Sequence, residues 1–145
     1  EQIQVPIVLI NNQEDGEYLH TVAANDEQGA QLAATHLLEL GHRRIGYLGV
    51  NDRPKSDRRR VEGYKRALKQ ARLAPDPSLI LYPEASSDIE RGQLGLEMFL
   101  EQGATAVFCY NDLTAIGLLM GCRHRKISVP EKLSVVGFDN IEAGC

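Results

Sequence analysis

Cysteine is scarce in this chain of 145 residues, and its pattern argues against two structural roles. The three cysteines, Cys109, Cys122 and Cys145, follow no pairing pattern, as expected for free or buried thiols in a reducing compartment. Structural zinc sites normally have clustered pairs of ligands, whereas the cysteines and histidines here are scattered. We therefore expect no disulfide framework, no metal site and a cytoplasmic location.

Long apolar runs are also missing. No stretch approaches the roughly 20 apolar residues that a membrane-spanning helix needs, and the first residues, EQIQVPIVLI, lack the basic region of a signal peptide. We expect no membrane partner. Because the chain starts on a strand-like run and ends after Asn140 without a helix or a closing strand, we also expect a segment of a longer protein.

The motifs of several enzyme classes are absent as well. The stretch Gly46-Tyr47-Leu48-Gly49 lacks the full dinucleotide-binding spacing, and no Walker loop or Gly-x-Ser-x-Gly elbow occurs. A net charge of −4 argues against direct contact with nucleic acid by this part of the protein. The sequence therefore predicts no catalytic residue and no cofactor.

The residues that are present form apolar segments that alternate between strand and helix patterns about five times. Apolar, β-branched runs predict strands at 5–10, 21–24, 45–50, 79–82, 106–109 and 133–138. Helical spacing and capping residues predict helices at about 26–40, 57–72, 88–102 and from 112 onwards. This alternation predicts an α/β fold, a doubly wound parallel sheet with helices on both faces.

Polar residues gather where the predicted strands lead into helices. In a parallel sheet, right-handed crossovers bring these junctions to one edge, and ligands bind just outside it. The junctions carry Asn25, the 52–60 loop, Ser86-Ser87, Asn111-Asp112 and Asp139-Asn140. None of the four histidines lies there, so the edge offers no general base. This edge is the predicted binding site.

Two charged residues of this edge are the leading candidates for ligand contact. Arg60 directly precedes Val61 at the start of a buried helical stripe, so its guanidinium fork can turn over the sheet edge. Asp139 can pair with Arg60 and accept from ligand hydroxyls, at about 1.5–3 kcal/mol per charged hydrogen bond. Purely local roles stay open as alternatives to ligand contact. In these, Asn111 acts as a helix cap and Asp139 is part of an Asp-Asn turn.

Four ordered segments make the sequence similar to a known family. They are residues 33–47 (AATHLLELGHRRIGY), 60–64 (RVEGY), 106–117 (AVFCYNDLTAIG) and 129–139 (VPEKLSVVGFD). With this order and spacing, the chain resembles the lactose-repressor (LacI/GalR) family of bacterial transcription regulators from about residue 5 to residue 139.

The resemblance implies one subdomain of a periplasmic-binding-protein type I fold, whose effector, often a sugar, lies between two subdomains. Residues 1–20 would be a lead-in strand and crossover from an N-terminal subdomain. Residues 21–145 would be the C-terminal effector-binding subdomain, truncated at its C-terminal end. The implied partners are a small-molecule effector, a second copy in a homodimer, and operator DNA through an N-terminal helix-turn-helix outside this sequence.

The resemblance also assigns roles to particular positions. The implied ligand-binding residues are Arg60, Asn111 and Asp139 as principal polar contacts, Ser56 and Ser87 in the pocket lining, and Asn11 and Asn25, where the family's usual residues differ. Ile116 and Leu119 fall where the family forms its homodimer, although a helical stripe of this kind is equally compatible with the core.

Two other functions remain open. One is a periplasmic sugar-binding protein of the same fold, and the other is a nucleotide-using enzyme on a flavodoxin-like sheet. The stretches His42-Arg43-Arg44-Ile45 and Gly137-Phe138-Asp139 favour the regulator over the first alternative. The second alternative needs a phosphate-cradling loop, and none is visible in the sequence.

Overall fold

The computed structural model describes residues 7–12 and 20–142. Their elements are β1 (Val8–Ile10), β2 (His20–Val22), α1 (Asp26–Glu39), β3 (Ile45–Leu48), α2 (Pro54–Gln70), the 3-10 turn η1 (Pro77–Leu79), β4 (Ile80–Leu81), α3 (Asp88–Glu101), β5 (Ala106–Cys109), α4 (Asp112–His124) and β6 (Ser134–Val136). No helix within these ranges is long and apolar enough to cross a bilayer.

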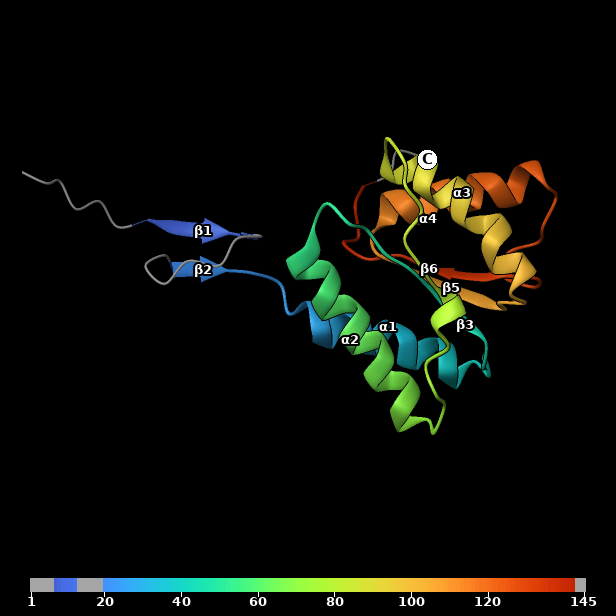
Figure 1. Cartoon of the computed structure of the whole chain (residues 1–145), viewed down its shortest axis with the longest axis horizontal. Helices are drawn as coiled ribbons and strands as arrows, with labels where there is room; N and C mark the ends of the chain where they lie inside the picture. Colours follow the sequence, from blue (N-terminus) through green and yellow to red (C-terminus); the bar gives the residue numbers. More distant parts are fainter. Residues whose placement is uncertain (1–6, 13–19, 143–145) are drawn as a thin grey trace, which may run out of the picture.

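The predicted parallel sheet is confirmed, with four strands in the order β4-β3-β5-β6. The pairs β3–β4, β3–β5 and β5–β6 are all parallel. The two N-terminal strands do not join this sheet, because β1 and β2 pair with each other in a separate parallel ladder. Figure 1 shows this small ladder lying apart from the main body. The expected strand over 5–10 lies partly outside the described residues.

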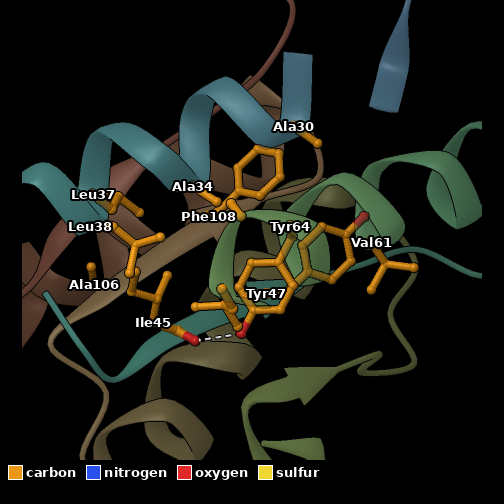
Figure 2. Packing of buried hydrophobic residues seen from close by; sticks show 12 residues of the cluster. Ala30, Ala34, Leu37, Leu38, Ile45, Tyr47, Val61, Tyr64, Ala106 and Phe108 are labelled. Carbon is orange, nitrogen blue, oxygen red and sulfur yellow. Dashed lines mark hydrogen bonds between the residues drawn. The ribbon is translucent and has the colours of Figure 1, made fainter. Parts of the chain in front are cut away.

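Helices cover both faces of the four-stranded sheet, as the sequence predicts (Figure 1). Tyr47 and Phe108 pack with α1 and α2 in one core cluster, whereas Leu48 and Val107 pack with α3 and α4 in the other. Figure 2 shows the first cluster, in which the Tyr64 hydroxyl donates to the Ile45 carbonyl oxygen at 2.7 Å. Every residue of β3 and β5 is buried, which explains their uninterrupted apolar sequences.

Glycines allow the two helices of each pair to approach closely. A Cβ atom on Gly63 of α2 would lie 2.1 Å from the carbonyl oxygen of Glu27 in α1. On the other face, a Cβ atom on Gly92 of α3 would lie 2.1 Å from the carbonyl oxygen of Thr114 in α4. Both helix pairs therefore need a residue without a side chain where they cross.

The main errors of the sequence prediction concern element ends and helix faces. Helix α2 begins at Pro54 and not at Asp57, because proline is well suited to the first helical position. Leu40, the last residue of the helix predicted at about 26–40, follows the end of α1 and is 62% exposed. Leu113 and Met120 of α4 lie on its exposed side, since the core-facing side of this helix is formed by other residues, among them Leu118.

Candidate functional site

A cavity of about 700 Å³ lies at the carboxyl edge of the sheet, between the main body and the residues that follow β1 and β2. Its lining comes from the loops after several strands, from the first residue of α1 and from the first two turns of α2. The lining residues are Asn11, Asn12, Ala23, Ala24, Asp26, Arg53, Lys55, Ser56, Arg59, Arg60, Tyr110, Phe138 and Asp139. This is the edge at which parallel α/β sheets bind ligands.

Arg60 is held in place by contacts from four directions. Its Nε donates to Asp26 at 2.9 Å, one Nη donates to the Tyr110 carbonyl oxygen, and the other lies 3.4 Å from an Asp139 oxygen. The guanidinium carbon lies 4.3 Å from the centre of the Tyr110 ring and 3.7 Å from that of Phe138. A guanidinium has five N–H groups, so these bonds leave two of them for a ligand.

Asp139 reaches the cavity from a turn after β6. Its φ is +104°, an unusual value for a residue other than glycine, and such conformations are concentrated at functional sites. Burial raises the pKa of its carboxyl above the ordinary value, while the nearby Arg60 charge acts in the opposite direction. The side chain remains partly exposed, so one carboxylate contacts both Arg60 and the cavity.

Two more of the residues implied by the family resemblance line the cavity. The Ser56 hydroxyl lies 2.6 Å from the Tyr110 hydroxyl, and either group can donate. Asn11, at the end of β1, has a φ of +51° and donates its backbone N–H to the Val22 carbonyl oxygen at 2.9 Å. The structure therefore brings Asn11, Ser56, Arg60 and Asp139 around one space.

The other three residues, Asn25, Ser87 and Asn111, are not among the lining residues of this cavity. Each is the N-cap of a helix and accepts from the backbone N–H three residues later, at 3.2, 3.2 and 2.9 Å respectively. The Asn111 amide also donates to Asp88 at 2.7 Å. Capping thus uses the side-chain oxygens of three residues that the family resemblance implies as ligand contacts.

Asp88 organises a second group of charged residues behind the cavity wall. Arg53 donates through one Nη to both Asp88 oxygens, at 2.7 and 2.8 Å, and Arg91 donates at 2.6 Å. Burial alone would raise the pKa of the Asp88 carboxyl, but the bonds from Arg53 and Asn111 hold it below the ordinary value. Arg53 is thereby fixed with its Cζ 4.9 Å from the centre of the Tyr110 ring.

Asp57 fixes the start of α2, which brings Arg53 and Ser56 to the cavity. It is buried, and one of its carboxylate oxygens accepts from the Tyr47 hydroxyl at 2.8 Å and from the Val50 backbone N–H at 3.0 Å. Burial raises the pKa of its carboxyl above the ordinary value, and these hydrogen bonds only partly oppose the shift. The loop between β3 and α2 is therefore anchored to the core.

The sequence analysis missed several residues of the site. Asp26, Arg53, Tyr110 and Phe138 all line the cavity, but none was singled out as a ligand contact. Tyr110 directly follows a buried apolar run and looks like its continuation, and Phe138 was assigned to the strand predicted at 133–138. A signal was available for Tyr110, because it directly precedes the Asn111-Asp112 junction at the predicted binding edge.

Residues 34–144 match the family described as "Periplasmic binding protein-like domain". The chain is 32% identical over 140 residues to the HTH-type transcriptional repressor PurR of Vibrio atlanticus, covering 95% of this chain and 41% of the relative. It is 36% identical over 123 residues to the ribose operon repressor of Haemophilus influenzae, covering 83% and 36% of the two chains. The chain thus spans about two-fifths of the length of these curated relatives.

A solved structure agrees with both matches. The crystal structure of a sugar-binding transcriptional regulator of the LacI family from Escherichia coli, complexed with phosphate, superposes with a TM-score of 0.81 at 33% identity. The match covers 94% of this chain and 49% of that one. Fold and sequence therefore lead to the same assignment: the chain belongs to the periplasmic binding protein-like family, in the form of the LacI/GalR-family effector-binding domain.

Proposed function

We propose that the chain is the effector-sensing part of a bacterial transcription regulator and that its effector binds in the cavity around Arg60. The observation that carries this proposal is the Arg60 guanidinium, which lies over two aromatic rings and donates to two carboxylates and one carbonyl oxygen, with two N–H groups left over. A donor fork oriented before binding lowers the cost of ordering the site. The regulators named among the relatives support the same role.

The effector is a sugar in this proposal. Arg60 supplies paired donors, while Asp139 and Ser56 supply acceptors, so the site can satisfy adjacent hydroxyl groups from both sides. The ribose operon repressor and the sugar-binding regulator among the similar proteins favour the same ligand class. Among the described residues no catalytic set is apparent, and the proposed activity is binding without chemistry.

Ligand binding would act by favouring one closure state of two subdomains. We assign residues 1–20 to the lead-in from an N-terminal subdomain and residues 21–145 to the C-terminal one, with the cavity where they meet. A cytoplasmic protein of this kind contacts operator DNA through an N-terminal helix-turn-helix. The effector controls DNA affinity only if it binds one closure state more tightly than the other.

The outer face of α4 is the proposed contact with a second copy of the chain. Leu113, Leu119 and Met120 are exposed there, and Ile116 is half-buried between them. Leu94 and Met98 of the neighbouring α3 are exposed as well. A homodimer that covers these side chains would remove an apolar surface from water.

Calorimetry on the intact regulator tests the binding site. Ribose, glucose, galactose and cellobiose serve as probes, and at least one should bind the wild type. Asp139→Asn should weaken that binding about 10- to 150-fold, the range expected for one charged hydrogen bond. Glu62→Gln is the matched control, because Glu62 is a carboxylate of α2 that lines a different depression. Equal affinities for wild type and Asp139→Asn would contradict the site.

A further inference from the structure

The turn after β6 carries an inference that rests on the proposed function, because it takes Asp139 as a ligand contact. We propose that Asp112, in the first turn of α4, is a positioning residue: it holds this turn so that the Asp139 carboxylate faces the cavity beside Arg60. Asp112 is not among the described residues that line the cavity. In this proposal it acts on the effector only through Asp139.

The backbone that carries the Asp139 carboxylate needs support from its surroundings. Asp139 and the next residue, Asn140, have φ values of +104° and +54°. Residues other than glycine rarely adopt such values, and they persist where the surrounding structure imposes the conformation. The contact between the side chains of Asp139 and Arg60, at 3.4 Å, is long for a hydrogen bond. Contacts to the backbone of the turn are therefore needed to hold it.

Asp112 supplies these contacts on both sides of Asp139. Its backbone N–H donates to the Phe138 carbonyl oxygen at 2.9 Å, and its Oδ2 accepts from the Ile141 backbone N–H, also at 2.9 Å. Its other carboxylate oxygen lies against Gly137, where a Cβ atom would be only 2.1 Å from Oδ1. One residue of α4 thus contacts the turn before and after the aspartate that faces the cavity.

A local role in α4 does not account for these contacts. Asn111 is the N-cap of the helix, and its side-chain oxygen accepts from the Thr114 backbone N–H at 2.9 Å and from the Thr114 hydroxyl at 2.7 Å. The negative charge of Asp112 is favourable at a helix N-terminus, but this effect needs no particular orientation of the carboxylate. Both oxygens of Asp112 contact the turn, and the helix dipole does not explain that orientation.

Two substitutions of Asp112 in the intact regulator separate positioning from the helix dipole. The effector is the sugar that binds the wild type among ribose, glucose, galactose and cellobiose, with affinity measured by calorimetry. Asp112→Ala removes the acceptor for the Ile141 N–H and should weaken binding about tenfold, the lower end of the loss expected for Asp139→Asn. Asp112→Asn keeps an oxygen acceptor while it loses the charge, so it should bind within about threefold of the wild type.

Glu90→Ala is the matched control. Glu90 is likewise an acid in the first turn of a helix, α3, and its carboxylate accepts from a loop backbone N–H, that of Ser86, at 2.7 Å. Neither residue is among the described residues that line the cavity. Glu90→Ala should therefore bind the sugar within about threefold of the wild type. Thermal unfolding of each variant shows that it is folded at the temperature of the binding measurement.

Gly137→Ala tests the same contact from the other side. Its methyl group would displace the Asp112 carboxylate, so this variant should lose about as much affinity as Asp112→Ala. It replaces Asp112→Ala in the comparison if that variant does not fold. A double-mutant cycle tests whether Asp112 acts through Asp139. In the Asp139→Asn background, Asp112→Ala should lower the affinity by less than about threefold more.

The outcomes distinguish this proposal from the sensor site itself. If Asp139→Asn weakens binding while Asp112→Ala and Gly137→Ala bind as the wild type does, the positioning role is overturned and the sensor site stands. Equal losses in Asp112→Ala and Asp112→Asn, or full multiplication of the losses in the cycle, also overturn the positioning role alone. If Asp139→Asn binds as the wild type does, or none of the sugars binds, both proposals fail.

Discussion

Arg60 has its orientation set before any ligand arrives. It is only 6% exposed, and its contacts come from residues that are distant in the sequence, Asp26, Tyr110 and Asp139. Its guanidinium carbon lies over the rings of both Tyr110 and Phe138, which adds to the contacts that hold it in place. Lysine could not reproduce this arrangement, because an ammonium group has neither the planar shape nor the fork of donors.

A buried carboxylate gives a prediction about pH. Burial raises the pKa of Asp57 in the folded protein, so the folded state binds a proton at this group more readily than the unfolded state. The contribution of this group to stability therefore falls as the pH rises from the unfolded pKa of about 3.9 through the raised folded pKa, and it is constant above that.

Asp57→Asn should remove this pH dependence. The two hydrogen bonds from Tyr47 and Val50 go to the same oxygen, which an amide can supply. Urea unfolding of both proteins between about pH 4 and pH 8 measures the result. The free energy of unfolding of the wild type should decrease relative to that of Asp57→Asn as the pH rises. If the free energies of unfolding of the two proteins differed by a constant amount across this range, the pKa of Asp57 would not be raised in the folded protein.

At the level of single residues, the sequence predicted where a residue lies better than it predicted the hydrogen-bond partners of its side chain. Arg60 and Asp139 were selected as candidate ligand contacts because they adjoin predicted buried runs. In the structure, an Nη atom of Arg60 lies 3.4 Å from a carboxylate oxygen of Asp139. Asn111 lies at the expected edge, but its side chain caps α4 and contacts Asp88. Chain position can indicate that a polar group is near the edge. It cannot indicate which neighbours will compete for its hydrogen bonds.

The elements with the clearest apolar patterns were predicted best. The strand predicted at 106–109 has those bounds in the structure, because four buried residues in a row leave little ambiguity. The strand predicted at 79–82 is shorter, since the 3-10 turn η1 takes up Leu79. The faces of α4 were harder to predict, because Leu118 is buried while Leu113, Leu119 and Met120 are exposed. Apolar spacing alone does not show whether a core or a partner covers a stripe.

This outward face of α4 gives a prediction at the scale of the element. Leu119→Glu would place a charge in the proposed contact between two copies, where it has no partner, so the dimer should dissociate at least about tenfold more readily. Leu32→Glu is the control, because Leu32 is an exposed leucine on α1. Sedimentation equilibrium of the intact regulator measures the change. An unaltered dimer in Leu119→Glu would place the contact elsewhere.

The architecture of the whole molecule explains why the cavity lies where it does. The chain adds β4 on one side of β3 and then crosses to add β5 and β6 on the other, so the order of the sheet reverses between β3 and β5. Such a reversal leaves a crevice at the carboxyl ends of the two strands. Arg60 follows β3 along the chain and contacts Tyr110, which directly follows β5. The alternation of strands and helices predicted this edge. The family resemblance added Asn11, which follows β1, whereas the contribution of Asn12 was not expected.

The affinity of the intact regulator for its operator, measured with and without the effector, tests the central claim most directly. In the wild type the effector should change this affinity about 5- to 150-fold. Arg60→Ala and Asp139→Ala should bind the operator as the wild type does, with thermal unfolding to confirm that they are folded, and should show no change with effector. Arg58→Ala should keep the full response. An Arg60→Ala or Asp139→Ala protein that responds at the normal effector concentration would contradict the assignment of this cavity as the sensor site.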